Sequence, residues 1–232
     1  MDSIGSIILE ALVMLVTGDA ELWSIISISF SISTIAILIA ALPATLCGFF
    51  LAYTNFPGRR LLISLANTLL ALPAVAVGLV LYILLSHQGP LGDWRLLFTQ
   101  SAMVIGQIVL SFPILVAMTH AAFQTVDLSA WETARTLGAN PVQSFFLIAR
   151  EVRFGIFGAV VAGYGRIIAE VGASMMLGGN ILHYTRNIPT AIALETSKGE
   201  FAQGIALGIV LVSLSFFLVT TLHYLQGKGQ VK

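Results

Sequence analysis

The stretch SIISISFSISTIAILIAALPATLCGFFLAYTNFPG, residues 24–58, contains no charged side chain. About 20 helical residues cross the hydrocarbon core of a bilayer, so this run can span a membrane with a tilt or a kink. Trp23 and Tyr53 lie near its ends, where amphipathic rings of membrane proteins gather. The 232-residue chain is 57% hydrophobic and only 9% charged, about a third of the charge usual in soluble domains. These features predict a membrane protein.

Four further apolar runs give five expected spans in all, near residues 23–53, 61–85, 101–123, 154–177 and 201–224. The sequence therefore predicts an all-α polytopic membrane protein. Pro43, Pro73 and Pro113 lie inside the first three runs. Because a proline in a spanning helix frees a carbonyl that needs another partner, each fits either helix packing or the lining of a cavity, and packing is favoured.

The basic residues set the expected orientation, because Lys and Arg favour cytoplasmic loops. With Arg166 set aside as intramembrane, seven fall on one side of the membrane and three on the other: Arg59, Arg60, Arg135, Arg150, Arg153, Lys228 and Lys232 against Arg95, Arg186 and Lys198. We therefore expect the N-terminus outside and the C-terminus in the cytoplasm.

Residues 1–20 are expected to form an amphipathic helix on the outer membrane surface, separate from a membrane domain over residues 21–232. Apolar side chains recur there at helical spacing, and Gly18 can end the helix. The segment lacks the basic start of a signal peptide and carries Asp2 instead. A short extra span is the alternative, which Glu10 disfavours.

The cytoplasmic segment 125–153 contains the polar stretch WETARTLGANPVQSFFLIAREVRFG. Ser129 and Glu132 have the spacing of a capping box, which predicts a helix starting near residue 130. Gly138 can end that helix, and Asn140 with Pro141 can start a second one. We therefore expect helix, turn and helix, with Trp131 and the pair Phe145 and Phe146 inserting into a partner.

The order of Glu132, Thr133 and Ala134, then Gly138 and Ile148, resembles the coupling loop of ABC-importer permeases. Thr133 departs from the usual Ala, and Arg150-Glu151 from a common Leu-Pro. TARTLGA and RIIAEVGASMMLGGNI are similar to the molybdate and tungstate branch, and YTRNIPTAIALETSKGEFA is most similar to its tungstate permeases. The resemblance implies contact with an ATPase through Trp131, Glu132, Thr133, Ala134, Arg135, Gly138, Asn140 and Pro141.

The resemblance further implies a type I ABC-importer (MetI-like) permease fold in a bacterial or archaeal plasma membrane, surrounded by lipid. Expected partners are a second copy of the chain, two ATP-binding subunits and a periplasmic or extracellular tungstate-binding protein. The chain lacks a G-x-x-x-x-G-K-[ST] loop. ATP and Mg are therefore expected on the partner ATPase, with no cofactor and no enzymatic activity here. Molybdate or another tetrahedral oxyanion is the alternative cargo, because its size, shape and charge are nearly the same.

Arg166 and Glu170 stand four apart inside the fourth run, where charges are costly. They fit a structural ion pair, which is favoured, or the translocation path or its gate. Further candidates for the path are Ser111, Pro113, Gly172 and Ser174. The external loop 178–200 is either a simple connector or a docking site for the binding protein, with Asn180, His183, Arg186 and Lys198 as candidates.

Two other classes of protein remain as alternatives. A secondary transporter needs coupling carboxylates and often an internal repeat, but only Glu170 qualifies and no repeat is evident. An intramembrane enzyme needs clustered acids or His near the interface, whereas the acidic residues here are scattered. The lone Cys47 cannot form an intrachain disulfide, no metal-binding spacing of Cys or His occurs, and zero net charge gives no case for nucleic acid.

Overall fold

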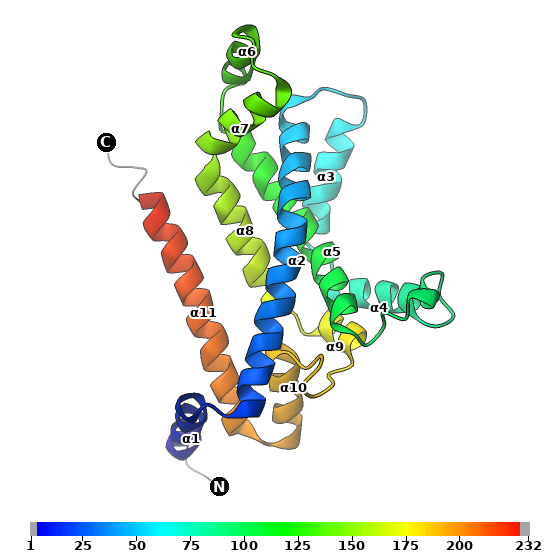
Figure 1. The fold of residues 1–232 in the computed structure, drawn as a ribbon, viewed down its shortest axis with the longest axis vertical. Helices are drawn as coiled ribbons and strands as arrows, with labels where there is room; N and C mark the ends of the chain where they lie inside the picture. The colour runs from blue at the N-terminus through cyan, green and yellow to red at the C-terminus, as the bar shows by residue number, and fades with distance from the viewer. Residues whose placement is uncertain (1–3, 228–232) are drawn as a thin grey trace.

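The computed structural model describes residues 4–227, and its regular structure is helical, with no strand among those residues. The elements are α1 Ile4–Thr17, α2 Ala20–Tyr53, α3 Arg59–Leu69, α4 Ala74–Leu85, the 3-10 turn η1 Gly92–Trp94, α5 Gln100–Phe123, α6 Leu128–Thr136, α7 Pro141–Glu151, α8 Arg153–Ile168, α9 Gly172–Gly178, α10 Ile188–Lys198 and α11 Phe201–Gly227. In Figure 1, α6 and α7 lie at one end of an elongated molecule, and α1 and α10 lie at the other.

Three of the five expected spans are continuous helices: α2, α5 and, within α11, Phe201–Leu222. Each is long and apolar enough, by length and composition, to cross a membrane alone. Pro43 lies inside α2 and Pro113 inside α5, and neither proline ends its helix. The predictions for residues 23–53, 101–123 and 201–224 are therefore confirmed.

The second expected span, 61–85, is not one helix. It consists of α3 and α4, whose axes differ by 104°, so that α4 projects sideways from the bundle in Figure 1. Pro73 is extended, with ψ 115°, and stands as the cap of α4. A proline has no N–H for the helix before it and disfavours a helical conformation at the preceding residue. The single span expected over residues 61–85 is therefore corrected to two helices that meet at a sharp change of direction.

The fourth expected span, 154–177, is also a bent pair, α8 and α9, with 63° between the helices. The two broken spans pack against each other at their breaks. A Cβ atom on Gly78 of α4 would lie 2.9 Å from Ala173 Cα, and one on Gly172 would lie 2.5 Å from Val75 Cγ2. Backbone at membrane depth that leaves its helix needs cover from protein. Each break supplies part of that cover for the other.

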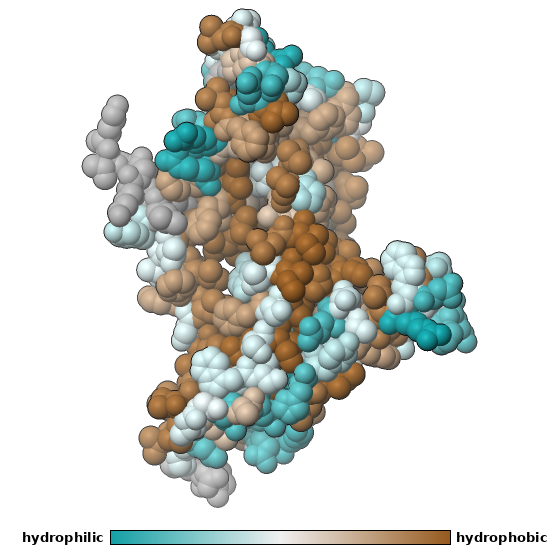
Figure 2. All heavy atoms as spheres, in the orientation of Figure 1, coloured by the Kyte–Doolittle hydropathy of each residue, from teal (hydrophilic) through white to brown (hydrophobic). Residues whose placement is uncertain are grey.

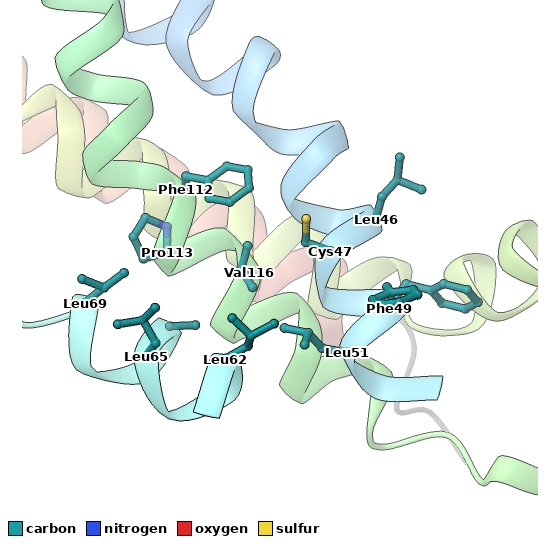
Figure 3. Close-up of a pocket in the computed structure, with 12 residues that line it drawn as sticks. Leu46, Cys47, Phe49, Leu51, Leu62, Leu65, Leu69, Phe112, Pro113 and Val116 are labelled. Carbon is teal, nitrogen blue, oxygen red and sulfur yellow. The ribbon is translucent and has the colours of Figure 1, made fainter. Parts of the chain in front are cut away.

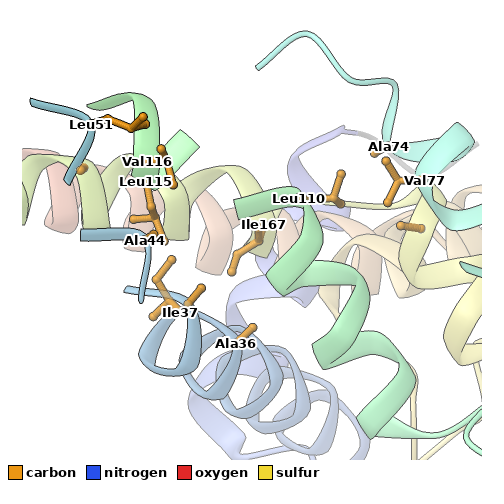
Figure 4. Packing of buried hydrophobic residues seen from close by; sticks show 13 residues of the cluster. Ala36, Ile37, Ala44, Leu51, Ala74, Val77, Leu110, Leu115, Val116 and Ile167 are labelled. Carbon is orange, nitrogen blue, oxygen red and sulfur yellow. The ribbon is translucent and has the colours of Figure 1, made fainter. Parts of the chain in front are cut away.

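The centre of the bundle is the contact between α2 and α5, the most extensive helix pair of the described chain. Small side chains on α2 let the two backbones approach, as is usual in membrane helix packing. They are the buried Ala36, Ala40 and Ala44, and Ile37, Leu115 and Ile167 pack beside them (Figure 4). Gly48 continues this row, and a Cβ atom there would lie only 2.8 Å from the backbone nitrogen of His120.

The N-terminal helix ends at Thr17, and Gly18 follows with φ +74°, so the expected end of the helix is confirmed. Ala11 is fully buried, in a cluster with residues of α2, α10 and α11. Leu12 and Val16, from the predicted apolar stripe, remain exposed. The position of α1 on the outer membrane surface stays a prediction.

Residues 178–200, expected as a loop, contain helix α10. Asn187 caps it by accepting a hydrogen bond from Thr190 N at 3.1 Å, and Pro189 lies in its first turn. The preceding turn is held by Thr185, whose hydroxyl donates to Gly178 O and accepts from Ile181 N at 3.0 Å. The expectation of a loop is therefore corrected. The motif N-x-P, with a cap and an early proline, carried the missed signal.

Hydrophilic residues lie mainly at the two ends of the molecule and at the tip of the α4 arm, whereas the surface between them is largely apolar (Figure 2). Large apolar side chains are exposed there on α2, α4 and α11, including Leu38, Leu42, Val80, Phe216 and Phe217. Such a belt is the surface that a bilayer covers.

Candidate functional site

Helices α6 and α7 form the helix, turn and helix expected at the polar end of the molecule. Gly138 takes the left-handed conformation with φ +89°, and Ala139 N donates to Ala134 O at 3.0 Å, which closes the end of α6. Asn140 and Gln143 form a reciprocal capping box at 2.8 and 2.9 Å, and Pro141 begins α7. The angle between the two helices is therefore set by local chemistry on both sides of Gly138.

The start of α6 differs from the expected capping box. Asp127 is the cap, and its Oδ1 accepts a hydrogen bond from Ser129 N at 3.0 Å. Ser129 and Glu132 therefore lie inside the helix. Asp is as good a cap as Ser and comes two residues earlier, so the helix starts at the first residue that can begin it. Glu132 is exposed and has no hydrogen-bond partner among the described residues, which leaves its carboxylate available to a partner.

The two helices are anchored to the bundle by an aromatic cluster around Phe49 of α2. The ring of Phe49 lies 5.4 Å from that of Trp131, 5.0 Å from that of Phe145 and 5.2 Å from that of Phe123. Tyr53 stacks beside them and donates its hydroxyl to Phe123 O at 3.1 Å. Trp131 and Phe145 thus contact the bundle, and their contact with a partner stays a prediction.

A second set of apolar side chains on this segment faces outward. Phe146 is 65% exposed and Leu137 is 83% exposed, and Val142 and Leu147 are also exposed. Arg135 and Arg150 lie on the same two helices, so this end of the chain belongs in water rather than in lipid. Clustered apolar side chains in water mark an interaction surface. We call Leu137, Val142, Phe146 and Leu147 the docking face.

A polar groove of about 780 Å³ runs beside the anchored segment. It lies between the end of α2, the turn into α3 and the start of α6, and Arg59, Asp127 and Glu132 line it. Arg59 Nε donates to Leu51 O at 2.6 Å, so its guanidinium satisfies a free carbonyl at the end of α2. The remaining coupling candidates differ in exposure: Thr133 and Arg135 are exposed, whereas Ala134 is buried.

Arg166 and Glu170 form the expected ion pair, although Glu170 lies in the break after α8 and not within a helix. Glu170 is buried, and its Oε1 also accepts from Gly172 N at 2.9 Å and from Ala173 N at 3.4 Å. The side chain of Arg166 is 40% exposed. Glu170 therefore neutralises Arg166 and caps α9 at once. This geometry fits a structural ion pair, and it also fits a place beside the translocation path or its gate, because Arg166 still reaches the surface at membrane depth.

Glu170→Ala should lower the stability of the membrane-inserted protein by about 1–3 kcal/mol, because it removes both the counter-ion and the cap. Partial exposure of Arg166 reduces the charge contribution. Arg166→Ala should cost less, since Glu170 keeps its two N–H donors. The measurement is the midpoint of thermal unfolding in detergent.

The double variant Glu170→Ala with Arg166→Ala should recover only the charge part, because the cap of α9 is still missing. Glu170→Gln, which keeps an acceptor for the cap, is the matched control. Wild-type yield and midpoint for Glu170→Ala would rule out a structural role for the pair.

The other candidates for the path are placed as follows. Ser111 is fully buried, and its hydroxyl donates to Ile108 O at 3.3 Å, while Ser174 is buried in α9. Pro113 lines an apolar groove beside Cys47 of α2 (Figure 3). Gly172 lies at the packed breaks. A role for these residues in the path stays a prediction.

The four candidates for docking of a binding protein lie near the end that carries α1 and α10. Arg186 pairs with Glu21 at 3.2 Å, and Lys198 pairs with Glu195 at 2.9 Å. Asn180 and His183 both have positive φ, 54° and 59°, in the turn before α10. Arg186 therefore ties the turn before α10 to α2, whereas the Lys198 pair lies within α10 itself. A docking role for the four stays a prediction.

Some residues that shape the site were missed in the sequence. Asp127 precedes a helical pattern as a cap does, and this signal was available in the segment DLSAWE. Phe49, by contrast, lies in a uniformly apolar run, where no local signal marks it as the centre of a cluster.

A family model described as "Binding-protein-dependent transport system inner membrane component" matches residues 44–228. The tungstate uptake system permease protein of Campylobacter jejuni is 38% identical over 217 residues, 94% of this chain and 91% of the relative. The protein of the same name from Peptoclostridium acidaminophilum is 39% identical over 216 residues, which are 93% of this chain and 95% of the relative. The molybdenum transport system permease protein of Escherichia coli K12 is 30% identical over 214 residues, which are 86% of this chain and 93% of the relative.

Two solved structures share the fold at a TM-score of 0.64 and 14% identity. One is the inward-facing MetNI methionine ABC transporter, and the match covers 89% of this chain and 93% of the transporter chain. The other is an amino acid ABC transporter crystallised with histidines, and the match covers 93% of this chain and 97% of the transporter chain. They confirm the type I (MetI-like) fold expected from the sequence.

Proposed function

The chain belongs to the family of binding-protein-dependent transport system inner membrane components, and we propose that it is the permease of an ATP-driven importer that carries tungstate into the cytoplasm. The observation that carries the choice of cargo is the higher identity to the two tungstate permeases than to the molybdenum permease. Molybdate is the second candidate, because both ions are tetrahedral dianions of nearly the same size. The chain itself is no enzyme, and ATP hydrolysis belongs to a separate subunit.

The docking face supports the division of labour between permease and ATPase. It presents four apolar side chains in water, and the aromatic cluster fixes it rigidly to α2 and α5. A rigid anchor transmits a push to the spans better than a loose loop does. The ATP-binding subunit, which holds ATP and Mg, is the partner that fits this surface.

Orientation follows the basic residues. The end that carries α6 and α7 has five of them, Arg59, Arg60, Arg135, Arg150 and Arg153, and faces the cytoplasm under the positive-inside rule. The end that carries α1 and α10 then faces outward and receives the binding protein. The C-terminus, whose two lysines lie outside the described residues, is cytoplasmic.

A homodimer embedded in lipid completes the transporter. Five spans are few for enclosing a polar path, and two-fold symmetry is the commonest way to build one between copies. Each copy then offers one docking face to one ATP-binding subunit.

The decisive experiment is ATPase turnover of the complex reconstituted in liposomes with binding protein loaded by tungstate, molybdate or sulfate. Tungstate should stimulate hydrolysis most. Equal or greater stimulation by molybdate would favour molybdate as the cargo. No stimulation by any of the three oxyanions would reject the function of an oxyanion importer.

Gly138→Val should leave the protein folded and inserted but weaken capture of the ATPase about tenfold. The left-handed backbone costs a β-branched residue about 1–2 kcal/mol, so the turn between α6 and α7 opens. Steric bulk is not the cause, because no atom lies within 4 Å of the added Cβ. The measurement is co-purification of the ATPase with the tagged permease.

Gly138→Asn is the matched control, because Asn tolerates the left-handed region better. Val142→Ala cannot serve as a neutral control, since Val142 belongs to the docking face. Undiminished capture by Gly138→Val would mean that the turn geometry is irrelevant to docking.

A further inference from the structure

Helix α3 carries a polar side that no part of the described chain covers. Arg60, Ser64, Asn67 and Thr68 share this side and line one shallow hollow of about 510 Å³. All four are exposed. We call them the polar sector of α3.

The opposite side of α3 is apolar. Leu62 and Leu65 are about half exposed. Leu62, Leu65 and Leu69 point into the apolar groove that α3 forms with α2 and α5 (Figure 3). Ile63 and Ala66 attach the helix to the core between the two sides. One helix therefore presents a lipid-like surface and a polar surface at the same depth.

That depth is inside the membrane. The groove across from the polar sector is lined by Leu46 and Cys47 of the uncharged run and by Phe112 of α5. At 1.5 Å per residue, Asn67 lies about 10 Å deeper than Arg60 along the helix. Lipid gives no hydrogen bonds to an amide, so polar side chains at such depth face protein or a water-filled cavity.

The side chains of the polar sector make few hydrogen bonds to the rest of the described chain. The Thr68 hydroxyl donates back to Ser64 O at 2.9 Å, whereas the Asn67 amide has no hydrogen-bond partner among residues 4–227. The Asn67 amide, with two N–H donors, and the Ser64 hydroxyl suit a tetrahedral oxyanion, because neutral donors bind it without the strong trap that a fixed cation makes. Arg60, nearer the α6 and α7 end, draws the anion toward that end.

We infer that Ser64, Asn67 and Thr68 line the route of the oxyanion through the half of the membrane next to the docking face, with Arg60 at its mouth. The inference rests on the proposed transport function. The competing arrangement is a dry contact of the same side with a second copy, in which water and anion are both excluded.

Cysteine accessibility separates these arrangements. Cys47 is the chain's one cysteine, so Cys47→Ser gives a clean background. Ser64→Cys, Asn67→Cys and Thr68→Cys probe the polar sector, and Leu62→Cys and Leu65→Cys, which lie in the apolar groove, are matched controls on the apolar side. Lightly permeabilised membranes holding the full complex are treated with an anionic methanethiosulfonate. The cysteine thiolate displaces methanesulfinate from the reagent and forms a mixed disulfide with it. The thiolate itself forms only where water reaches the cysteine.

The three polar-sector cysteines should react at least about tenfold faster than the two controls. Equal rates on both sides of α3 would overturn the inference. In labelled Asn67→Cys complexes the attached sulfonate is a fixed negative charge on the route. After reconstitution into sealed liposomes, these complexes should take up tungstate at least about tenfold more slowly. The same treatment of Leu62→Cys should leave uptake at its untreated level. Full uptake by completely labelled Asn67→Cys complexes would also overturn it.

The outcomes distinguish the inference from the function on which it rests. If the chain does not import tungstate, the untreated complex already fails to take it up, and this is seen before any labelling. If only the inference fails, untreated complexes import tungstate while the two sides of α3 label alike.

Discussion

Phe146→Asp should leave the permease folded in the membrane and reduce capture of the ATP-binding subunit by about two orders of magnitude. The Phe146 side chain belongs to the docking face and is 65% exposed, so the bundle loses little when it is replaced. Aromatic side chains at the centre of an interface typically contribute about 2–4 kcal/mol to binding, and a carboxylate adds a desolvation cost. The measurement is the amount of ATPase retained by the tagged permease, followed by substrate-stimulated turnover.

Its neighbour gives the matched control. Phe145 lies among the rings of Phe49, Phe123 and Phe146, so Phe145→Ala should lower the stability of the permease by about 2–4 kcal/mol. Two adjacent phenylalanines should thus separate binding from folding. If Phe146→Asp retained the ATPase fully, α7 would not be part of the interface.

Gly48→Val should yield almost no folded protein. A Cβ atom at this position of α2 meets the Thr119 hydroxyl and comes within 2.8 Å of the His120 backbone nitrogen on α5. A side chain can rotate away, but a backbone atom in a helix cannot, so the two central helices must separate. Overpacking at a flexible site costs about 1–3 kcal/mol, and this rigid contact should cost about 3 kcal/mol or more. The measurement is the monodisperse yield in detergent and the midpoint of thermal unfolding.

Gly208→Ala on α11 is the control for the effect of replacing a helical glycine. No atom lies within 4 Å of a Cβ atom at Gly208, and alanine favours a helix by about 1 kcal/mol over glycine. This variant should be neutral or slightly more stable. A normal unfolding midpoint for Gly48→Val would show that α2 and α5 do not approach as closely as described.

Local chemistry and hydrophobic length made several features predictable from the sequence. The left-handed turn at Gly138, the cap at Asn140 with Pro141 and the helix end before Gly18 each depend on two or three neighbouring residues. The continuous spans depend on the length of an apolar run, which is read directly. The pairing of Arg166 with Glu170 follows from two opposite charges that lipid would not tolerate separately.

Features that depend on distant contacts could not be predicted in the same way. Pro73 signalled a disturbance in the second span, but the 104° change of direction depends on what α4 packs against, namely α9. Trp131 and Phe145 looked like surface aromatics because nothing near them in the sequence reveals Phe49. The buried position of Ser111 and the ion pair of Arg186 with Glu21 likewise follow from packing or from a partner that no motif names.

The packing of α4 against α9 has a consequence for how the protein is made. About 100 residues of chain separate Val75 from Gly172, and a ribosome adds roughly 5–20 residues per second. The α3–α4 break therefore waits about 5–20 seconds after its synthesis before the residues that cover it exist. During that time its open backbone groups depend on the insertion machinery or on water. A chain released before α9 is complete therefore keeps that break uncovered.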